Sequence, residues 1–266
     1  MLSTDDIIPL DDTTNYEQGD VDIDPQYWDS KWFTHQSYQP EEERIREWHN
    51  WIYDEGLSDY NTAIYHNHGL QRTHVAHRGS KDFYEDWYTS DYHIAMGTEE
   101  RDARFGKAIS LTEQAYLQNG YITDVSGHSL GGSLASHVNK NLGNNWWYGK
   151  TTTWNAGVSE VAKGSHSHRA AHECNGPSPP VYCGKITHIK QEGDLVSNRT
   201  IFDTAVSAFS PFTGFVARNV FGISGKKYDE YGKTVTYNNR SSFADFLGLR
   251  PINAHLMGSF RGGYED

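Results

Sequence analysis

The chain has 266 residues, of which 36% are hydrophobic and 22% are charged, and its net charge at pH 7 is −12. This length suits one domain with a substantial core, and the acidic balance argues against a nucleic-acid partner, because binding phosphates requires a basic face. Nine acidic residues and no Lys or Arg lie within residues 1–30, which leaves a net charge of −3 for the other 236 residues. We therefore expect an acidic N-terminal extension, residues 1–39, that is mobile or lies over the body, followed by one domain, residues 40–266.

Targeting and membrane signals are weak. The start MLSTDDIIPL has no basic residue and no long apolar run, so a cleavable secretory signal is not expected. An intracellular protein is favoured unless the chain is a trimmed mature form. The most apolar segment, residues 205–223, is interrupted by Thr213, Arg218 and Asn219, so no transmembrane segment is expected. The oligomeric state is left open.

The hydrophobic pattern predicts elements in the following chain order. They are a helix over 40–56, strands over 62–66 and 72–77, a helix over 99–118, a strand over 121–125, a helix over 133–143, and strands over 151–155 and 185–191. Alternating strands and helices predict an α/β fold with an open, largely parallel sheet covered on both faces. One residue conflicts with this pattern, because Asp124 stands in a strand that should be apolar. Either Asp124 is paired inside the protein or this strand is wetter than usual.

A glycine-rich stretch follows that strand. Residues 127–131, GHSLG, match G-x-S-x-G, in which a sharp strand-to-helix turn exposes a serine hydroxyl. The alternative is an ordinary serine in a glycine-rich turn. As a nucleophile, Ser129 needs a histidine that accepts its proton and a carboxylate that orients the histidine.

The rest of the chain offers few partners in the order Ser, Asp, His that this fold uses. The only one of the fourteen histidines beyond Leu195 is His255. Asp194 follows a predicted strand and a short turn, at the sheet edge where such folds place their sites. Asp203 is the reserve candidate for the carboxylate.

Four segments in order, VAHRGS with a downstream DW, VSGHSLGGSLAS, QEGDLVSN and NAHLMGSF, resemble the fungal-type class 3 lipase family. They span about residues 60–260. The resemblance implies the α/β-hydrolase fold, with Ser129 as nucleophile, Asp194 as orienting carboxylate and His255 as general base and acid. It also implies an oxyanion hole formed by the backbone N–H of Leu130 and the backbone N–H and hydroxyl of Ser80. No cofactor and no metal are implied.

Two positions depart from the family pattern. His77 stands where the family usually has an aromatic residue, and Asp124 stands where it usually has an aliphatic one. Neither change removes a catalytic atom, but His77 could alter how Ser80 is held.

Cysteine and histidine leave alternatives open. Cys174 and Cys183 are nine positions apart in a Pro-rich loop, where they could form a disulfide or remain free thiols. His166, His168, His172 and Cys174 could instead ligate zinc, although their spacing matches no closed structural site. Asp20, Asp22 and Asp24 lack the glycine and glutamate of a calcium loop.

The resulting hypothesis is a serine hydrolase that cleaves lipid esters, of the triacylglycerol lipase or phospholipase type, through an acyl-enzyme. Two alternatives are an esterase or acyltransferase for small soluble esters, and a catalytically silent binding protein with a hydrolase fold. Within the first hypothesis, residues 81–94 are expected to form an aromatic lid helix and residues 205–223 to line the acyl-chain site. Ordinary core is the alternative for both segments.

Overall fold

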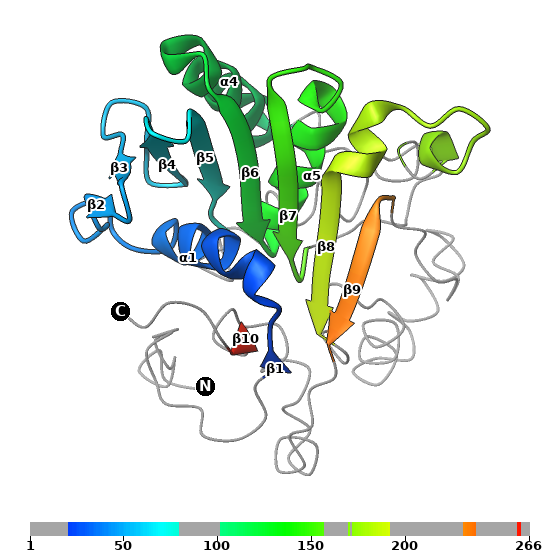
Figure 1. Cartoon of the computed structure of the whole chain (residues 1–266), viewed down its shortest axis with the longest axis horizontal. Coiled ribbons are helices and arrows are strands. Elements are labelled where there is room, and N and C mark those ends of the chain that lie inside the picture. Colours follow the sequence, from blue (N-terminus) through cyan, green and yellow to red (C-terminus); the bar gives the residue numbers. More distant parts are fainter. Residues whose placement is uncertain are drawn as a thin grey trace, which may run out of the picture.

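The computed structural model describes residues 21–79, 102–156, 170, 172–191, 231–237 and 260–261. Its main feature is an eight-stranded sheet in the order β2-β3-β4-β5-β6-β7-β8-β9 (Figure 1). The strands are β2 (Glu47–Trp48), β3 (Trp51–Tyr53), β4 (Thr62–Asn67), β5 (Arg72–His77), β6 (Ile122–His128), β7 (Tyr148–Trp154), β8 (Ile186–Gln191) and β9 (Lys233–Tyr237). Neighbouring strands from β2 to β5 are antiparallel, and those from β5 to β9 are parallel.

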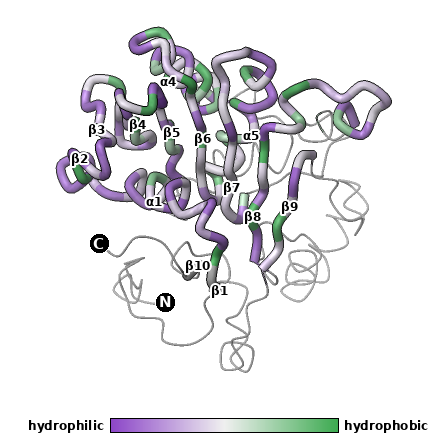
Figure 2. The backbone as a smooth tube through the Cα atoms, in the orientation of Figure 1, coloured by the Kyte–Doolittle hydropathy of each residue, from purple (hydrophilic) through white to green (hydrophobic). Residues whose placement is uncertain are grey.

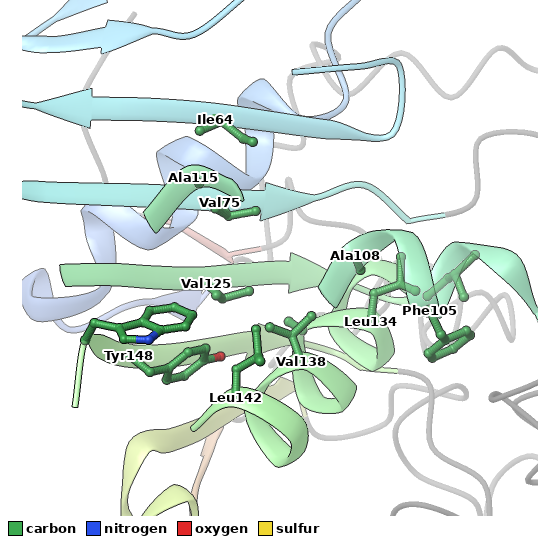
Figure 3. Close-up of a cluster of buried hydrophobic side chains, with 13 residues drawn as sticks. Ile64, Val75, Phe105, Ala108, Ala115, Val125, Leu134, Val138, Leu142 and Tyr148 are labelled. Carbon is green, nitrogen blue, oxygen red and sulfur yellow. The ribbon is translucent and has the colours of Figure 1, made fainter. Parts of the chain in front are cut away.

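Helices cover both faces of the sheet (Figure 1). Successive side chains of a strand point to opposite faces, and the core clusters follow that rule. Val75 and Val125 lie in one cluster with residues of α4 (Ala103–Asn119) and α5 (Leu130–Leu142), as Figure 3 shows. Ala76 lies in the other cluster with residues of α1 (Trp28–Gln36). The α/β fold expected from the sequence is confirmed.

Most elements predicted around the glycine-rich turn are confirmed. Strand β5 has the predicted bounds, and β4, β6, β7 and β8 lie within a few residues of theirs. Helix α4 begins after Asp102, whose carboxylate accepts a hydrogen bond from the Arg104 N–H at 2.9 Å. It ends at Gly120, which adopts a left-handed φ of 68° that glycine tolerates.

The helix predicted over residues 40–56 is wrong. This segment contains turns and the antiparallel strands β2 and β3. His49 and Asn50 have φ values of 44° and 66°, as a two-residue hairpin turn requires. Trp51 and Tyr53 are buried whereas Ile52 between them is 45% exposed, so the apolar pattern has the period of a strand.

The N-terminal region packs onto the sheet from Ile23, which clusters with Tyr27, Trp154 and Ile189, while residues 1–20 lie outside the described part. Strand β1 (Val21–Asp22) pairs with β10 (Phe260–Arg261), and the turn η2 (Pro25–Tyr27) leads into α1. Trp32 stacks on Trp48 with ring centroids 4.0 Å apart. The large buried side chains of the cluster that contains Trp32 are aromatic, namely Trp32, Phe33, Trp51, Tyr53 and Tyr65, although Figure 2 colours most of α1 and the β2–β3 hairpin as hydrophilic.

Two further alternatives are resolved. Cys174 and Cys183 form a disulfide with their Cα atoms 5.7 Å apart, so they are not free thiols. Cys174 is therefore not available as a zinc ligand, and His166 and His168 lie outside the described residues. In the part of the chain that the structure describes, no three His, Cys, Asp or Glu side chains are grouped as a metal site would need. Within the same residues, no helix has both the length and the apolar character needed to cross a membrane.

Candidate active site

Ser129 occupies the turn between the end of β6 and the start of α5. Its backbone angles are φ 55° and ψ −123°, in a region that costs a residue with a side chain roughly 1–3 kcal/mol. Its N–H donates to the Trp154 carbonyl at 3.0 Å, and its own carbonyl accepts from the Ser133 N–H at 3.2 Å. These bonds on both sides hold the strained serine in place, as in a nucleophile elbow.

Glycines allow the turn to be this tight. A Cβ on Gly127 would overlap the Gly131 carbonyl group, and a Cβ on Gly131 would overlap the His77 carbonyl oxygen. The close approaches bring the first turn of α5 against the ends of β5 and β6. A strained serine at the turn from a parallel strand to a helix, in a mixed sheet with helices on both faces, is the arrangement of one known fold. The chain has the α/β-hydrolase fold.

This α/β-hydrolase turn presents two groups, the Ser129 side chain and the backbone N–H of Leu130. The Ser129 side chain is partly exposed and does not cap α5. Leu130 is 1% exposed and packs in the core, which fixes the backbone that carries its N–H. This N–H belongs to the first turn of α5, where backbone N–H groups have no partner within the helix and the helix dipole is positive. The position suits the binding of a developing oxyanion.

Only part of the expected site lies in the described residues. Ser129 and Leu130 are described, whereas Ser80, Asp194 and His255 lie outside, as do residues 81–94 and 205–223. The described neighbours of two of these residues are informative. Gly79 precedes Ser80, and a Cβ on Gly79 would lie 3.2 Å from the Ser129 Cβ. Residues of β8, which precedes Asp194 in the chain, pair in parallel with β7, so both strands end at the sheet edge that carries Ser129.

Sequence reasoning missed Tyr38, which lies just beyond α1. Its hydroxyl is 2.7 Å from His128 Nδ1 and accepts a hydrogen bond from the Gly79 N–H at 3.1 Å. His128 is the residue before Ser129, and Gly79 is the residue before Ser80. No local motif marks Tyr38, because more than forty positions separate it from the nearer of these partners.

A second connection from α1 supports the strand beneath the turn. The Thr34 hydroxyl lies 2.8 Å from the Ser126 hydroxyl on β6, which is also 2.8 Å from His74 Nε2 on β5. All three residues are buried. Burial lowers the pKa of His74 to about 3, so its ring is neutral in this network near neutral pH.

His77, the unusual residue of the HRGS segment, lies at the end of β5 and is fully buried. Its Nδ1 is 3.3 Å from the Thr62 hydroxyl, and among the residues that the structure describes its Nε2 has no hydrogen-bond partner. Burial lowers the pKa of His77 to about 4, so it is also neutral near neutral pH. His77 therefore fills the place of an apolar ring and brings no charge to the site.

No protein-family model matches the chain, and no curated protein matches it. It is similar to solved structures of fungal lipases. The Lip2 lipase of Yarrowia lipolytica is 16% identical with a TM-score of 0.44, and the match covers 68% of this chain and 77% of that one. A triacylglycerol lipase of Penicillium expansum is 13% identical with a TM-score of 0.47, covering 80% and 78%. The Rhizomucor miehei lipase propeptide complex is 14% identical with a TM-score of 0.39, covering 76% and 74%. The fold of this chain is established by its strand order and by Ser129, not by these low-identity similarities.

Proposed function

We propose that the protein is a serine hydrolase that cleaves carboxylic esters of lipids. The observation that carries the proposal is the backbone of Ser129, held at φ 55° between a parallel strand and a helix that begins at Leu130. A strained conformation at a serine is costly and persists only where the surrounding structure enforces it. Such a turn presents the hydroxyl at the sheet edge and places a helix N–H beside it.

In the proposed reaction, Ser129 is the nucleophile. His255 removes the proton of the Ser129 hydroxyl, and Asp194 orients the imidazole and stabilises its protonated form. The serine oxygen attacks the ester carbonyl carbon, and the carbonyl oxygen becomes an oxyanion. His255 then gives the proton to the leaving alcohol, and the acyl group remains on Ser129. A water molecule, deprotonated by His255, releases the acid and regenerates the serine.

The oxyanion is bound by the Leu130 N–H and by the N–H and hydroxyl of Ser80. Removing one such donor typically reduces turnover by about 10²–10³-fold. The described backbone supports this pairing, because Gly79 lies against Ser129 and Leu130 follows it directly. The lipid class of the substrate is supported by the four sequence segments that resemble class 3 lipases.

Labelling with a fluorophosphonate and hydrolysis of nitrophenyl esters of short and long acyl chains test the proposal. We expect Ser129 to be labelled, and Ser129→Ala to lose labelling and hydrolysis while remaining folded. Ser133→Ala, one turn further along α5, is the matched control and should keep both. An unlabelled parent protein would contradict the proposal and favour a silent binding protein, and turnover of short chains alone would favour a soluble-ester esterase.

The carboxylate is tested separately. We expect Asp194→Asn to reduce turnover by about 10⁴-fold, by analogy with other triads. Asp203→Asn is the control. If Asp203→Asn were as damaging, the orienting residue would be misassigned.

A lid over residues 81–94 would make the rate rise as the substrate passes its solubility limit, because an interface selects the open state. Trp87→Ala should reduce that rise. Smooth saturation in both proteins would assign this segment to the core.

A further inference from the structure

The Tyr38 hydroxyl joins the two chain segments that precede the expected oxyanion donors. It contacts the ring of His128, immediately before Ser129 and Leu130, and the backbone of Gly79, immediately before Ser80. The contact with Gly79 is close, because a Cβ on Gly79 would overlap the Tyr38 oxygen and would also lie 2.7 Å from the His128 carbonyl oxygen. Tyr38, Gly79 and His128 therefore meet at one point next to Ser129.

The directions of these hydrogen bonds follow from their donors. The Gly79 N–H can only donate, so the Tyr38 oxygen accepts there. The hydroxyl retains its own proton, which it can give to His128 Nδ1 at 2.7 Å. In that arrangement the imidazole carries its proton on Nε2. One hydroxyl thus accepts a hydrogen bond from Gly79, just beyond β5, and lies within hydrogen-bond distance of His128 Nδ1 at the end of β6, where the tautomer of the imidazole sets the donor.

Tyr38 itself is held firmly. Its N–H donates to the His35 carbonyl at 2.9 Å, and the Ser37 hydroxyl donates to the Thr34 carbonyl at 2.7 Å, so the chain beyond α1 continues in a defined turn. The guanidinium of Arg78 lies 5.8 Å from the centre of the Tyr38 ring. Arg78 is only 2% exposed, so its position is fixed by packing. The contacts of Tyr38 with Gly79 and His128, called the Tyr38 bracket below, are therefore supported by α1, which packs against the sheet.

We propose that Tyr38 is a positioning residue that sets the separation of the two oxyanion donors through Gly79 and His128. This proposal rests on the proposed ester hydrolase function. Strands β5 and β6 pair in parallel up to His77 and Gly127. Beyond that pair, the Tyr38 hydroxyl contacts both Gly79, the residue before Ser80, and His128, the residue before Ser129. Loss of the hydroxyl would let the two ends shift relative to each other. The oxyanion develops only in the transition state, so a shift should reduce kcat more than it changes KM.

Tyr38→Phe removes the hydroxyl and keeps the ring. We expect kcat for a nitrophenyl ester to fall by about 10- to 100-fold, the range associated with small misplacements of catalytic groups, while KM changes by less than about twofold. The matched control is Tyr231→Phe, which removes a buried hydroxyl that donates to the Ser136 carbonyl at 2.9 Å on the same helix α5. The control should keep the parent kcat. An unchanged kcat in folded Tyr38→Phe, or an equal loss in both variants, would overturn the proposal.

Variants of His128 remove the other partner of the Tyr38 hydroxyl in the Tyr38 bracket. They test the proposal even if Tyr38→Phe does not fold. His128→Asn can place an amide oxygen near the position of Nδ1 and should keep most of kcat, whereas His128→Leu should lose as much as Tyr38→Phe. Combining Tyr38→Phe with His128→Leu should cost little more than either change alone. Full additivity, or equal activity of the Asn and Leu variants, would overturn the proposal. A parent protein that neither hydrolyses esters nor labels at Ser129 would refute the proposed function instead.

Discussion

Arg72 and Asp124 form an ion pair across the parallel strands β5 and β6, with Arg72 Nε 2.9 Å from Asp124 Oδ2. The second oxygen of Asp124 accepts a hydrogen bond from the Lys150 N–H at 2.7 Å. Asp124 thus links three consecutive strands of the sheet at the end opposite Ser129. The unexpected polar residue of the central strand is therefore paired, which decides between the two readings that the sequence left open.

Breaking this pair should destabilise the fold. Asp124→Leu leaves the Arg72 guanidinium and the Lys150 N–H without their acceptor, so we expect a loss of about 1–3 kcal/mol in the free energy of unfolding. Urea denaturation measures it. Arg72→Leu combined with Asp124→Leu should cost less than the sum of the single changes, because the two groups interact.

The surface pair of Arg46 and Glu55 provides the control for this experiment. Their side chains are 49% and 68% exposed, and exposed ion pairs contribute little to stability. Glu55→Gln should change the free energy of unfolding by less than about 1 kcal/mol. A loss in Asp124→Leu no larger than in Glu55→Gln would show that the Arg72–Asp124 pair does not stabilise the sheet.

The strain at Ser129 should be measurable. Glycine adopts a positive φ at no steric cost, so Ser129→Gly should be more stable than Ser129→Ala by about 1 kcal/mol or more. Both variants should lack hydrolysis, which separates stability from activity. The midpoints of thermal unfolding of the two variants give the comparison. Equal midpoints would mean that the serine backbone is relaxed.

The disulfide between Cys174 and Cys183 closes a short loop. For a loop of this size, replacing both cysteines by serine should cost about 2–3 kcal/mol, mainly because the unfolded chain gains freedom. A reductant should lower the free energy of unfolding of the parent protein by a similar amount, as measured by urea denaturation. It should leave that of the double variant unchanged. A parent protein insensitive to full reduction would contradict this.

Buried neutral histidines should make stability depend on pH. Burial lowers the pKa of His77 to about 4 in the folded protein, whereas an unfolded histidine titrates near 6.5. The unfolded state therefore binds more protons below pH 6.5. His77 supports stability fully above that pH, and its contribution is lost as the pH falls from about 6.5 towards about 4, with a slope of about 1.4 kcal/mol per pH unit. His74, with a pKa of about 3, acts in the same direction.

His77→Phe tests this dependence directly. Phenylalanine does not titrate and has a ring of similar size. The slope of the unfolding free energy against pH between about pH 4 and pH 6 should therefore fall by about 1.4 kcal/mol per pH unit, the value for one proton. His68, which is exposed and contacts Tyr121, is a control position for His→Phe. Parallel pH profiles for the parent protein and His77→Phe would show that His77 is already protonated in the folded state.

Local sequence patterns correctly predicted the elements around the Ser129 turn. Leu130, Leu134, Val138 and Leu142 recur at helical spacing after a strand and a glycine-rich turn, and the structure has β6, the Ser129 turn and α5 there. The same kind of pattern led to a wrong prediction nearer the N-terminus, in residues 40–56. The spacing of Ile45, Trp48 and Ile52 predicts one face of a helix over residues 40–56, but apolar spacing over so short a segment also fits the period of a strand. Pairing with β4 decided in favour of strands.

The sequence alone predicted the α/β fold class and the position of the Ser129 turn, both of which the structure has. It also predicted the candidate residues Ser80, Asp194 and His255, which lie outside the described residues. These predictions depend on local periodicity and on short motifs, which consist of residues close together in the chain. Only the tertiary structure decided that Asp124 is paired with Arg72, that Cys174 is bonded to Cys183, and that Tyr38 contacts both Gly79 and His128. Each of these is a contact between side chains or segments that meet only after folding, because the geometry of a contact depends on where the sheet places its strands.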